Sequence, residues 1–202
     1  MIALWDLGNV VVEWNPDKIL QMTNLPAKKT EQLREQLFGS ELWLDLDRGI
    51  TDEATVASAV ASLSDLQADE LSRCFDVVRE SLVDFPKTVA LIEEMHSAGI
   101  PLYILSNMSE DNARYLRTRP YFDLFNGIVI SANEKLIKPD PALFQIVLRR
   151  FDLTAQNIVF IDDSQPNIDT AEALGMHGVH FKATDHCYTR VRSFFPELAS
   201  QP

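Results

Sequence analysis

Five short apolar runs constrain the fold of this 202-residue chain more than any other feature of its sequence. Most of the runs are nearly uninterrupted, which is typical of parallel strands that helices cover on both faces. Helix-like segments with apolar residues at three- and four-residue spacing lie between the later runs. This alternation predicts an α/β fold with an open, doubly wound parallel sheet of about five strands. The predicted strands are residues 2–5, 101–105, 127–130, 158–161 and 177–181.

The interval between the first two predicted strands is too long for a single crossover. A β-α-β unit takes roughly 30 residues, whereas residues 7–100 separate these strands. A helix at 87–98, ending near Gly99, supplies the crossover. The surplus is helical throughout, and Thr51, followed by acidic residues, is predicted to cap one of its helices. We therefore predict a core made of residues 1–14 and 83–202, with a helical cap inserted at residues 15–82.

The composition argues against several classes of partner. The chain has 30 acidic and 18 basic side chains, and its formal net charge is −12. This charge repels nucleic acid and anionic lipid, so we expect neither as a partner. No apolar stretch approaches a membrane span, and the chain opens without a signal-peptide pattern. Cys74 and Cys187 have no ligand or redox spacing, which favours reduced thiols. We expect a cytoplasmic protein, and the sequence does not predict its oligomeric state.

Polar side chains follow four of the predicted strands, where ligands of open α/β sheets bind. Three acidic side chains there suit Mg²⁺, a cation that prefers oxygen ligands, and Mn²⁺ accepts the same ligands. A carboxylate can attack phosphorus, while a lysine and a hydroxyl hold the charged phosphoryl oxygens. The strand ends therefore predict metal-dependent phosphoryl transfer. The residues concerned are Asp6, then Ser106 and Asn107, then Lys138, and finally Asp162 and Asp163.

Four segments in chain order, LWDLGNV, LYILSN, IKPDPALF and VFIDDSQPNIDTAEALG, resemble the motifs of haloacid dehalogenase superfamily hydrolases. They span residues 4–175. The resemblance implies a Rossmann-like core, a C1-type helical cap and phosphate-ester hydrolysis through an aspartyl-phosphate. It implies that Asp6 is the nucleophile and a metal ligand, and that the Gly8 carbonyl is a second ligand. The other implied roles are phosphate binding for Ser106, Asn107 and Lys138, metal binding for Asp162 and Asp163, and support of the metal site by Asn167.

The first motif departs from the usual pattern at Gly8. Most phosphatases of this superfamily have a second Asp there, which protonates the leaving group and later activates water. A glycine keeps the main-chain carbonyl but transfers no proton, a step worth roughly 10²–10⁴-fold in rate. The opening DLGNVVV is similar to that of bacterial α-glucose-1-phosphate phosphatases of the superfamily. We therefore predict a small phosphorylated metabolite as substrate, a sugar phosphate, and Glu13 is a weaker candidate for the missing acid.

Two other functions remain open. In a 2-haloacid dehalogenase of this fold, Asp6 would attack carbon without a metal, although the acids at 162–163 would repel the haloacid carboxylate. With Gly8 in place of an acid, the chain could instead bind a phosphorylated ligand as a sensor. Within the cap, Trp43 and Arg48 either face the site, where they would stack on a sugar and pair with phosphate, or serve as a core residue and a surface ion-pair partner.

Overall fold

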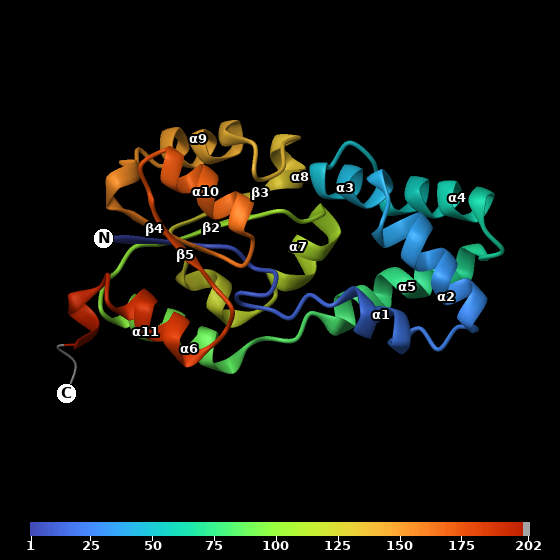
Figure 1. Ribbon diagram of the computed structural model, residues 1–202, viewed down its shortest axis with the longest axis horizontal. Coiled ribbons are helices and arrows are strands. Elements are labelled where there is room, and N and C mark those ends of the chain that lie inside the picture. Colours follow the sequence, from blue (N-terminus) through green and yellow to red (C-terminus); the bar gives the residue numbers. More distant parts are fainter. Residues whose placement is uncertain (200–202) are drawn as a thin grey trace.

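The computed structural model describes residues 1–199 and contains one parallel sheet in the order β3-β2-β1-β4-β5 (Figure 1). This architecture confirms the predicted α/β fold with a doubly wound parallel sheet. Chain order reverses at β1, which pairs with β2 on one side and β4 on the other, so a ligand crevice is expected beyond the end of β1. The strands are β1 (Ile2–Trp5), β2 (Leu102–Ser106), β3 (Gly127–Ile130), β4 (Ile158–Asp162) and β5 (His177–His180).

Helices cover both faces of this sheet, which explains the nearly continuous apolar runs. Successive strand side chains point to opposite faces. Leu4 therefore packs with Phe144 on one face, whereas Trp5 packs in a second apolar cluster on the other face. The first face is covered by α9 (Pro141–Arg150) and α10 (Gln165–Ala173), and the second by α6 (Pro86–Ser97), α7 (Glu110–Leu116) and α11 (Asp185–Arg192).

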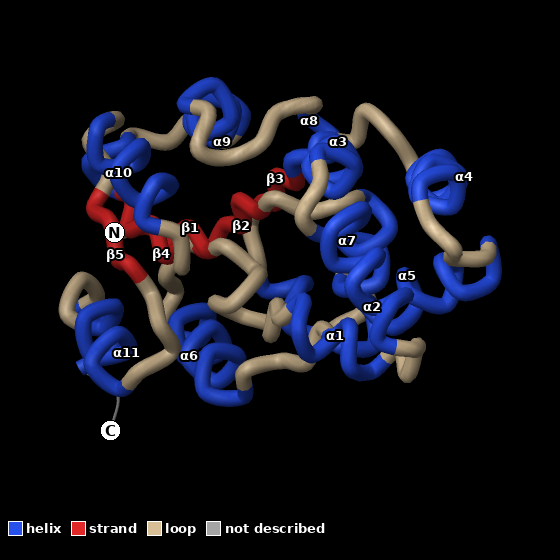
Figure 2. The backbone as a smooth tube through the Cα atoms, turned by 45° about the vertical axis from the view of Figure 1, so that its right-hand side comes forward, coloured by secondary structure: helices blue, strands red, loops and turns tan. Residues whose placement is uncertain are grey.

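The helices between Pro16 and Ser81, which we call the cap, have an apolar cluster of their own that includes Leu33, Val60 and Phe75. Figure 1 shows them grouped beyond one end of the sheet, and in Figure 2 they lie to the right of the strands. None of the helices within residues 1–199 is long and apolar enough to cross a membrane. The cap elements are α1 (Pro16–Met22), α2 (Ala27–Leu33), a π-helical segment (Arg34–Phe38), α3 (Glu41–Arg48), α4 (Glu53–Leu63) and α5 (Ala68–Ser81).

The predicted N-cap residue of α4 is wrong by one position. Asp52, and not Thr51, occupies the N-cap position, and its carboxylate accepts a hydrogen bond from the Thr55 backbone N–H at 2.7 Å. Threonine and aspartate are both common N-cap residues. The carboxylate adds a negative charge at the positive end of the helix dipole, which favours Asp52 as the N-cap.

The end of α3 packs closely against α8 (Ser131–Glu134), a short helix that follows β3. Gly49 has a φ of +69°, and a Cβ atom there would lie 2.2 Å from the Ala132 carbonyl oxygen. The Ser131 hydroxyl donates to the Asp47 backbone carbonyl at 2.5 Å, and the Lys135 ammonium group donates to the Gly49 carbonyl. These contacts fix the end of α3 relative to the sheet.

Candidate active site

Asp6 lies at the end of β1, at the point where the strand order reverses. Its backbone N–H donates to the Ile161 carbonyl at 2.9 Å, which extends the pairing of β1 with β4 by one residue. The Lys138 ammonium nitrogen lies 2.9 Å from an Asp6 carboxylate oxygen and 2.6 Å from an Asp162 oxygen. It also donates to the Leu105 carbonyl at 2.9 Å. A buried lysine thus joins two buried carboxylates that would otherwise repel one another.

The charges in this network determine its protonation. Burial holds the pKa of Asp6 above its usual range, Lys138 opposes the rise and the charge of Asp162 adds to it. Burial alone would lower the pKa of Lys138, but the charges of Asp6 and Asp162 outweigh it and raise that pKa. Lys138 is therefore a permanent positive charge beside Asp6, and its field can stabilise anionic oxygens bound there.

The sequence-predicted acids form one cluster, in which Asp6, Asp162 and Asp163 each offer an oxygen within 4.8 Å of the others. Asp6 and Asp163 line a cavity. The structure shows one hydrogen bond to the Asp163 carboxylate, which the Asn9 amide donates at 3.0 Å. An all-oxygen donor set with acceptor capacity left over fits a hard divalent cation such as Mg²⁺.

Asp162 is the last residue of β4 and is fully buried. One of its oxygens accepts from the Ser164 backbone N–H at 2.8 Å and from the Asn167 amide at 3.0 Å. Its other oxygen accepts from Lys138 at 2.6 Å and from the same amide at 3.1 Å. Each Asp162 carboxylate oxygen thus accepts two hydrogen bonds. Asp162 is therefore better placed to orient Lys138 than to bind a cation directly.

Ser106 and Asn107 end β2 and begin the loop that follows. The Ser106 hydroxyl is buried and has no hydrogen-bond partner of good geometry in the described structure, although it lies close enough to Asp6 to lower the pKa of that carboxyl. Such a hydroxyl calls for a ligand. The Asn107 carboxamide donates to the Lys138 carbonyl at 3.0 Å and accepts from the Lys138 N–H at 2.7 Å. Asn107 therefore positions the lysine.

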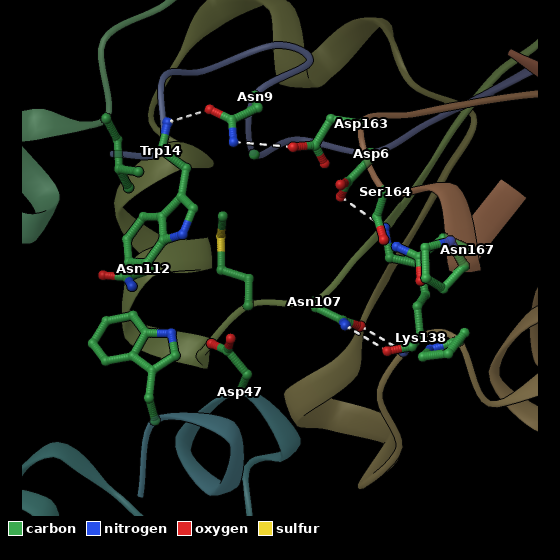
Figure 3. Close-up of a pocket in the computed structure, with 16 residues that line it drawn as sticks. Asp6, Asn9, Trp14, Asp47, Asn107, Asn112, Lys138, Asp163, Ser164 and Asn167 are labelled. Atoms are coloured by element: carbon green, nitrogen blue, oxygen red, sulfur yellow. Dashed lines mark hydrogen bonds and ion pairs between the residues drawn. The ribbon is translucent and has the colours of Figure 1, made fainter. Parts of the chain in front are cut away.

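A cavity of about 360 Å³ lies between these residues and the cap (Figure 3). We call Asp6, Ser106, Lys138, Asp162 and Asp163 the floor of the site, and Trp14, Trp43 and Asp47 its roof. The two indole rings are stacked, with centroids 5.2 Å apart and an interplanar angle of 25°. The volume suits a small organic molecule. Other residues that line the cavity include Gly8, Leu82, Asn107, Met108, Asn112 and Asn167.

The two residues predicted in the cap have different positions. Trp43 lines the cavity and also packs in the apolar cluster of the cap, so both interpretations of Trp43 fit. Arg48 is not among the cavity-lining residues, and its guanidinium lies 2.8 Å from Asp45 and 3.6 Å from Glu41. This is the arrangement of a surface ion-pair partner. Glu13 likewise pairs with Lys18, at 2.5 Å, and does not line the cavity.

Gly8 lines the cavity, but nothing in its backbone requires a glycine. It is absent from the glycines with positive φ. The nearest atom to a Cβ built there is the Trp14 Cβ at 3.6 Å, an ordinary contact. A Cβ atom at this position would fit, so neither the backbone conformation nor a close contact at Cβ requires a glycine there.

Asp47 is the residue that the sequence interpretation missed. It lies in the last turn of α3, is half-buried, and lines the cavity. Burial raises its pKa to about 7, the Ser109 backbone N–H and the Trp43 side chain oppose the rise, and the charge of Asp6 adds to it. Its spacing of four residues from Trp43 in LWLDLDRG places both on one helix face, and this pattern could have identified it.

Comparison with known proteins places this site in a family. The family model for haloacid dehalogenase-like hydrolases matches residues 4–175. A sesquiterpene phosphatase, astK from Aspergillus oryzae, is 29% identical over 181 residues, which are 88% of each chain.

Two solved structures share the fold. HAD family enzyme bt-2542 from Bacteroides thetaiotaomicron, in complex with magnesium and inorganic phosphate, superposes with a TM-score of 0.76 at 20% identity, over 93% of this chain and 97% of that one. L-2-haloacid dehalogenase from Xanthobacter autotrophicus, with chloropropionic acid covalently bound, gives a TM-score of 0.67 at 17% identity. The match covers 96% of this chain and 83% of that one. The match of the family model across most of the chain shows that it belongs to the haloacid dehalogenase-like hydrolases.

Proposed function

We propose that this hydrolase is a magnesium-dependent phosphatase that cleaves a small phosphorylated metabolite through an aspartyl-phosphate on Asp6. The observation that carries the proposal is the position of Lys138 between Asp6 and Asp162, beside the Asp163 carboxylate, at the bottom of a cavity. Phosphoryl transfer joins an anionic nucleophile to an anionic substrate, so it needs this combination of a carboxylate, fixed positive charge and oxygen ligands for a cation.

Asp6, Asp163 and the Gly8 carbonyl would hold the metal, Mg²⁺ or alternatively Mn²⁺, with Asp162 behind them. When bound, the cation neutralises charge on the phosphoryl oxygens. The donor set supports this assignment because it offers oxygen ligands only. The neighbour from Bacteroides thetaiotaomicron, which holds magnesium and phosphate, supports it further.

The chain's own residues account for the two displacement steps. An Asp6 oxygen forms a bond to phosphorus as the bond to the leaving-group oxygen breaks. The charge of Lys138 and the Ser106 hydroxyl would stabilise the phosphoryl oxygens, and the Asn107 carboxamide keeps the lysine in place. Water then attacks phosphorus, and release of phosphate returns Asp6 as a carboxylate. The roof covers part of the cavity and would limit the access of bulk water during both steps.

The organic part of the substrate would lie against the roof. A sugar ring can stack on an indole face, and the partnerless buried Asn112 amide oxygen could accept a hydrogen bond from a hydroxyl. An apolar organic group is a second candidate, which the stacked Trp14 and Trp43 and the likeness to a sesquiterpene phosphatase favour. We place the activity in the cytoplasm, where the two free, buried cysteines would stay reduced.

A dehalogenase function is less consistent with the floor. Asp6, Asp162 and Asp163 carry more negative charge than Lys138 balances, and a haloacid carboxylate would meet repulsion there. A sensor function remains the other alternative, in which a phosphate stays on Asp6 without turnover.

A substrate panel tests the proposal. It contains sugar phosphates, isoprenoid monophosphates, an aryl phosphate and 2-haloacids, each assayed with Mg²⁺ and with chelator. We expect Mg²⁺-dependent release of phosphate that Asp6→Asn reduces by roughly 10⁴-fold or more, because the nucleophile is lost. Metal-independent release of halide would favour the dehalogenase. Stoichiometric, long-lived phosphorylation without turnover would favour the sensor.

A further inference from the structure

A phosphate ester with an alkyl leaving group needs a proton donor, because an alkoxide is a poor leaving group. Few cavity-lining groups can supply one. The Lys138 ammonium group is already paired with two carboxylates. Asp6 and Asp163 belong to the acidic cluster that would hold the metal. Among the described residues that line the cavity there is no histidine, cysteine or tyrosine. Within residues 1–199, Asp47 is the one carboxyl group of the cavity wall outside the acidic cluster.

We propose that Asp47 is the general acid and base of this phosphatase, delivered to the site by the cap. This inference rests on the proposed phosphatase function. It gives the roof a catalytic residue in addition to its surface for the organic group.

Asp47 lies on a different wall of the cavity from Asp6, as a group that protonates the leaving oxygen should. Asp6 and Asp47 reach into the cavity from different walls, one from the end of β1 and the other from α3 (Figure 3). In an in-line displacement the leaving oxygen lies on the side of phosphorus away from the attacking atom. A phosphoryl group held between Lys138 and Ser106 for attack by Asp6 would therefore direct its leaving oxygen toward the roof.

The backbone of Asp47 is anchored to the sheet. Its carbonyl accepts from the Ser131 hydroxyl at 2.5 Å, and Ser131 in turn accepts from the Met108 N–H at 2.8 Å. Two residues later, Gly49 lies against Ala132, so close that no Cβ fits. An acid that must meet a reacting oxygen needs a fixed position, and these contacts supply one.

The environment of Asp47 also suits a group that both donates and accepts protons. Its pKa of about 7, raised mainly by burial, allows both protonation states near neutral pH. The charged groups that share its cavity are Asp6, Lys138 and Asp163. On its own helix the neighbouring Arg48 is neutralised by Asp45, and beyond α8 the Lys135 ammonium group is bonded to the Gly49 carbonyl.

The proton balance closes over one cycle. In the first step the Asp47 proton moves to the ester oxygen as its bond to phosphorus breaks and the Asp6–phosphorus bond forms. Asp47 is then a carboxylate. In the second step it accepts a proton from water as the water oxygen bonds to phosphorus and the Asp6–phosphorus bond breaks. The acid is restored when phosphate leaves, and no other reactant is needed.

The test compares Asp47→Asn with Asp45→Asn, a matched control on the same helix whose carboxylate pairs with Arg48 outside the cavity. Two substrates are used with Mg²⁺, an alkyl phosphate and p-nitrophenyl phosphate, whose leaving group needs no proton. For Asp47→Asn we expect kcat/KM to fall about 10²–10⁴-fold on the alkyl ester and far less on the aryl ester. We also expect a burst of nitrophenol, since slow attack by water lets the phosphoenzyme accumulate. Asp45→Asn should keep the wild-type values.

Equal losses on both esters without a burst, or no loss on either, would overturn the role of Asp47. Failure of the wild-type protein to hydrolyse any phosphate would instead overturn the phosphatase function itself. Should Asp47→Asn not fold, the wild-type protein still gives an answer through a series of phosphates with graded leaving groups. Protonation by Asp47 predicts a kcat/KM that depends weakly on the acidity of the leaving alcohol, and a steep dependence contradicts it.

Discussion

On the floor of the site each buried carboxylate is matched by Lys138 or by amide donors, whereas on the roof a single carboxylate lies beside two stacked indole rings. The floor residues come from the ends of β1, β2 and β4 and the loop after β3. The roof comes from α3 and from Trp14, just before α1. The difference indicates a division of work. In the proposed phosphatase, the floor would treat any phosphoryl group alike, while the roof would meet the part of the substrate that differs from one ester to another.

The largest effect is expected when the charge balance of the floor is broken. Lys138→Met keeps the length of the side chain but leaves Asp6 and Asp162 buried without their shared cation. We expect the free energy of unfolding to fall by about 3–5 kcal/mol. We also expect kcat to fall roughly 10²–10³-fold, because fixed positive charge at the phosphoryl oxygens is lost. Denaturant unfolding and steady-state kinetics measure the two effects.

Lys87→Met is the control for this substitution, since Lys87 pairs with Asp185 on the exposed surface. An exposed pair contributes about 0–1 kcal/mol, so this variant should resemble the wild type. If Lys138→Met were no less stable than Lys87→Met, the two floor carboxylates would not depend on the lysine for their charge balance.

The second effect concerns the contact that holds roof and floor together. Gly49 and Gly99 both have positive φ, at +69° and +75°. A Cβ at Gly49 would lie 2.2 Å from the Ala132 carbonyl oxygen, whereas one at Gly99 has no atom within 4 Å. Both alanine variants should lose about 1–2 kcal/mol of stability from the left-handed backbone. Only Gly49→Ala should also displace the end of α3, with a roughly 10–100-fold fall in kcat/KM.

Thermal unfolding and kcat/KM on an alkyl phosphate separate these contributions. Equal activity in the two glycine variants would mean that the close packing of Gly49 on Ala132 does not align the roof with the floor.

The same division explains how much the sequence could predict. The floor could be predicted from the sequence because each strand is an apolar run that ends at a polar residue, and parallel strands end at one edge of a sheet. Asp6, Lys138, Asp162 and Asp163 do come together there. The spacing of Asp47 from Trp43 places both on one helix face, but that face reaches the site through the packing of α3 against α8, which no local pattern specifies. Arg48 pairs with its own helix because Asp45 lies three residues away.

A smaller effect should follow from changing the aromatic surface of the roof. Trp43→Leu removes one of the two stacked rings but keeps an apolar side chain in the cap cluster. We expect KM for organic phosphates to rise about tenfold, since stacking and contact area are lost. Inhibition by inorganic phosphate should not change, because that ion would contact only the floor. An equal loss for phosphate and organic esters would show that Trp43 acts through the fold of the site.

A last effect, on stability and not on activity, is a dependence on pH that originates in the roof. The folded-state pKa of Asp47 is raised from 3.8 to about 7, so the folded protein retains a proton that the unfolded chain releases. Stability therefore falls as pH rises from about 4 to about 7, and the whole penalty is present above that range. Asp47→Asn removes the charge, and we expect it to be more stable than the wild type at about pH 8 by roughly 1–3 kcal/mol.

Urea unfolding with chelator present, at about pH 4 and about pH 8, measures this difference. The gain should be small at the lower pH, where Asp47 is protonated in the folded state and only partly ionised in the unfolded chain, and Asp45→Asn should show no such pH-dependent gain. A stabilisation that persisted at low pH would mean that asparagine improves packing and does not relieve a buried charge. A gain confined to high pH would show that the roof keeps this acid at a cost in stability, as expected for a group retained for proton transfer and not for folding.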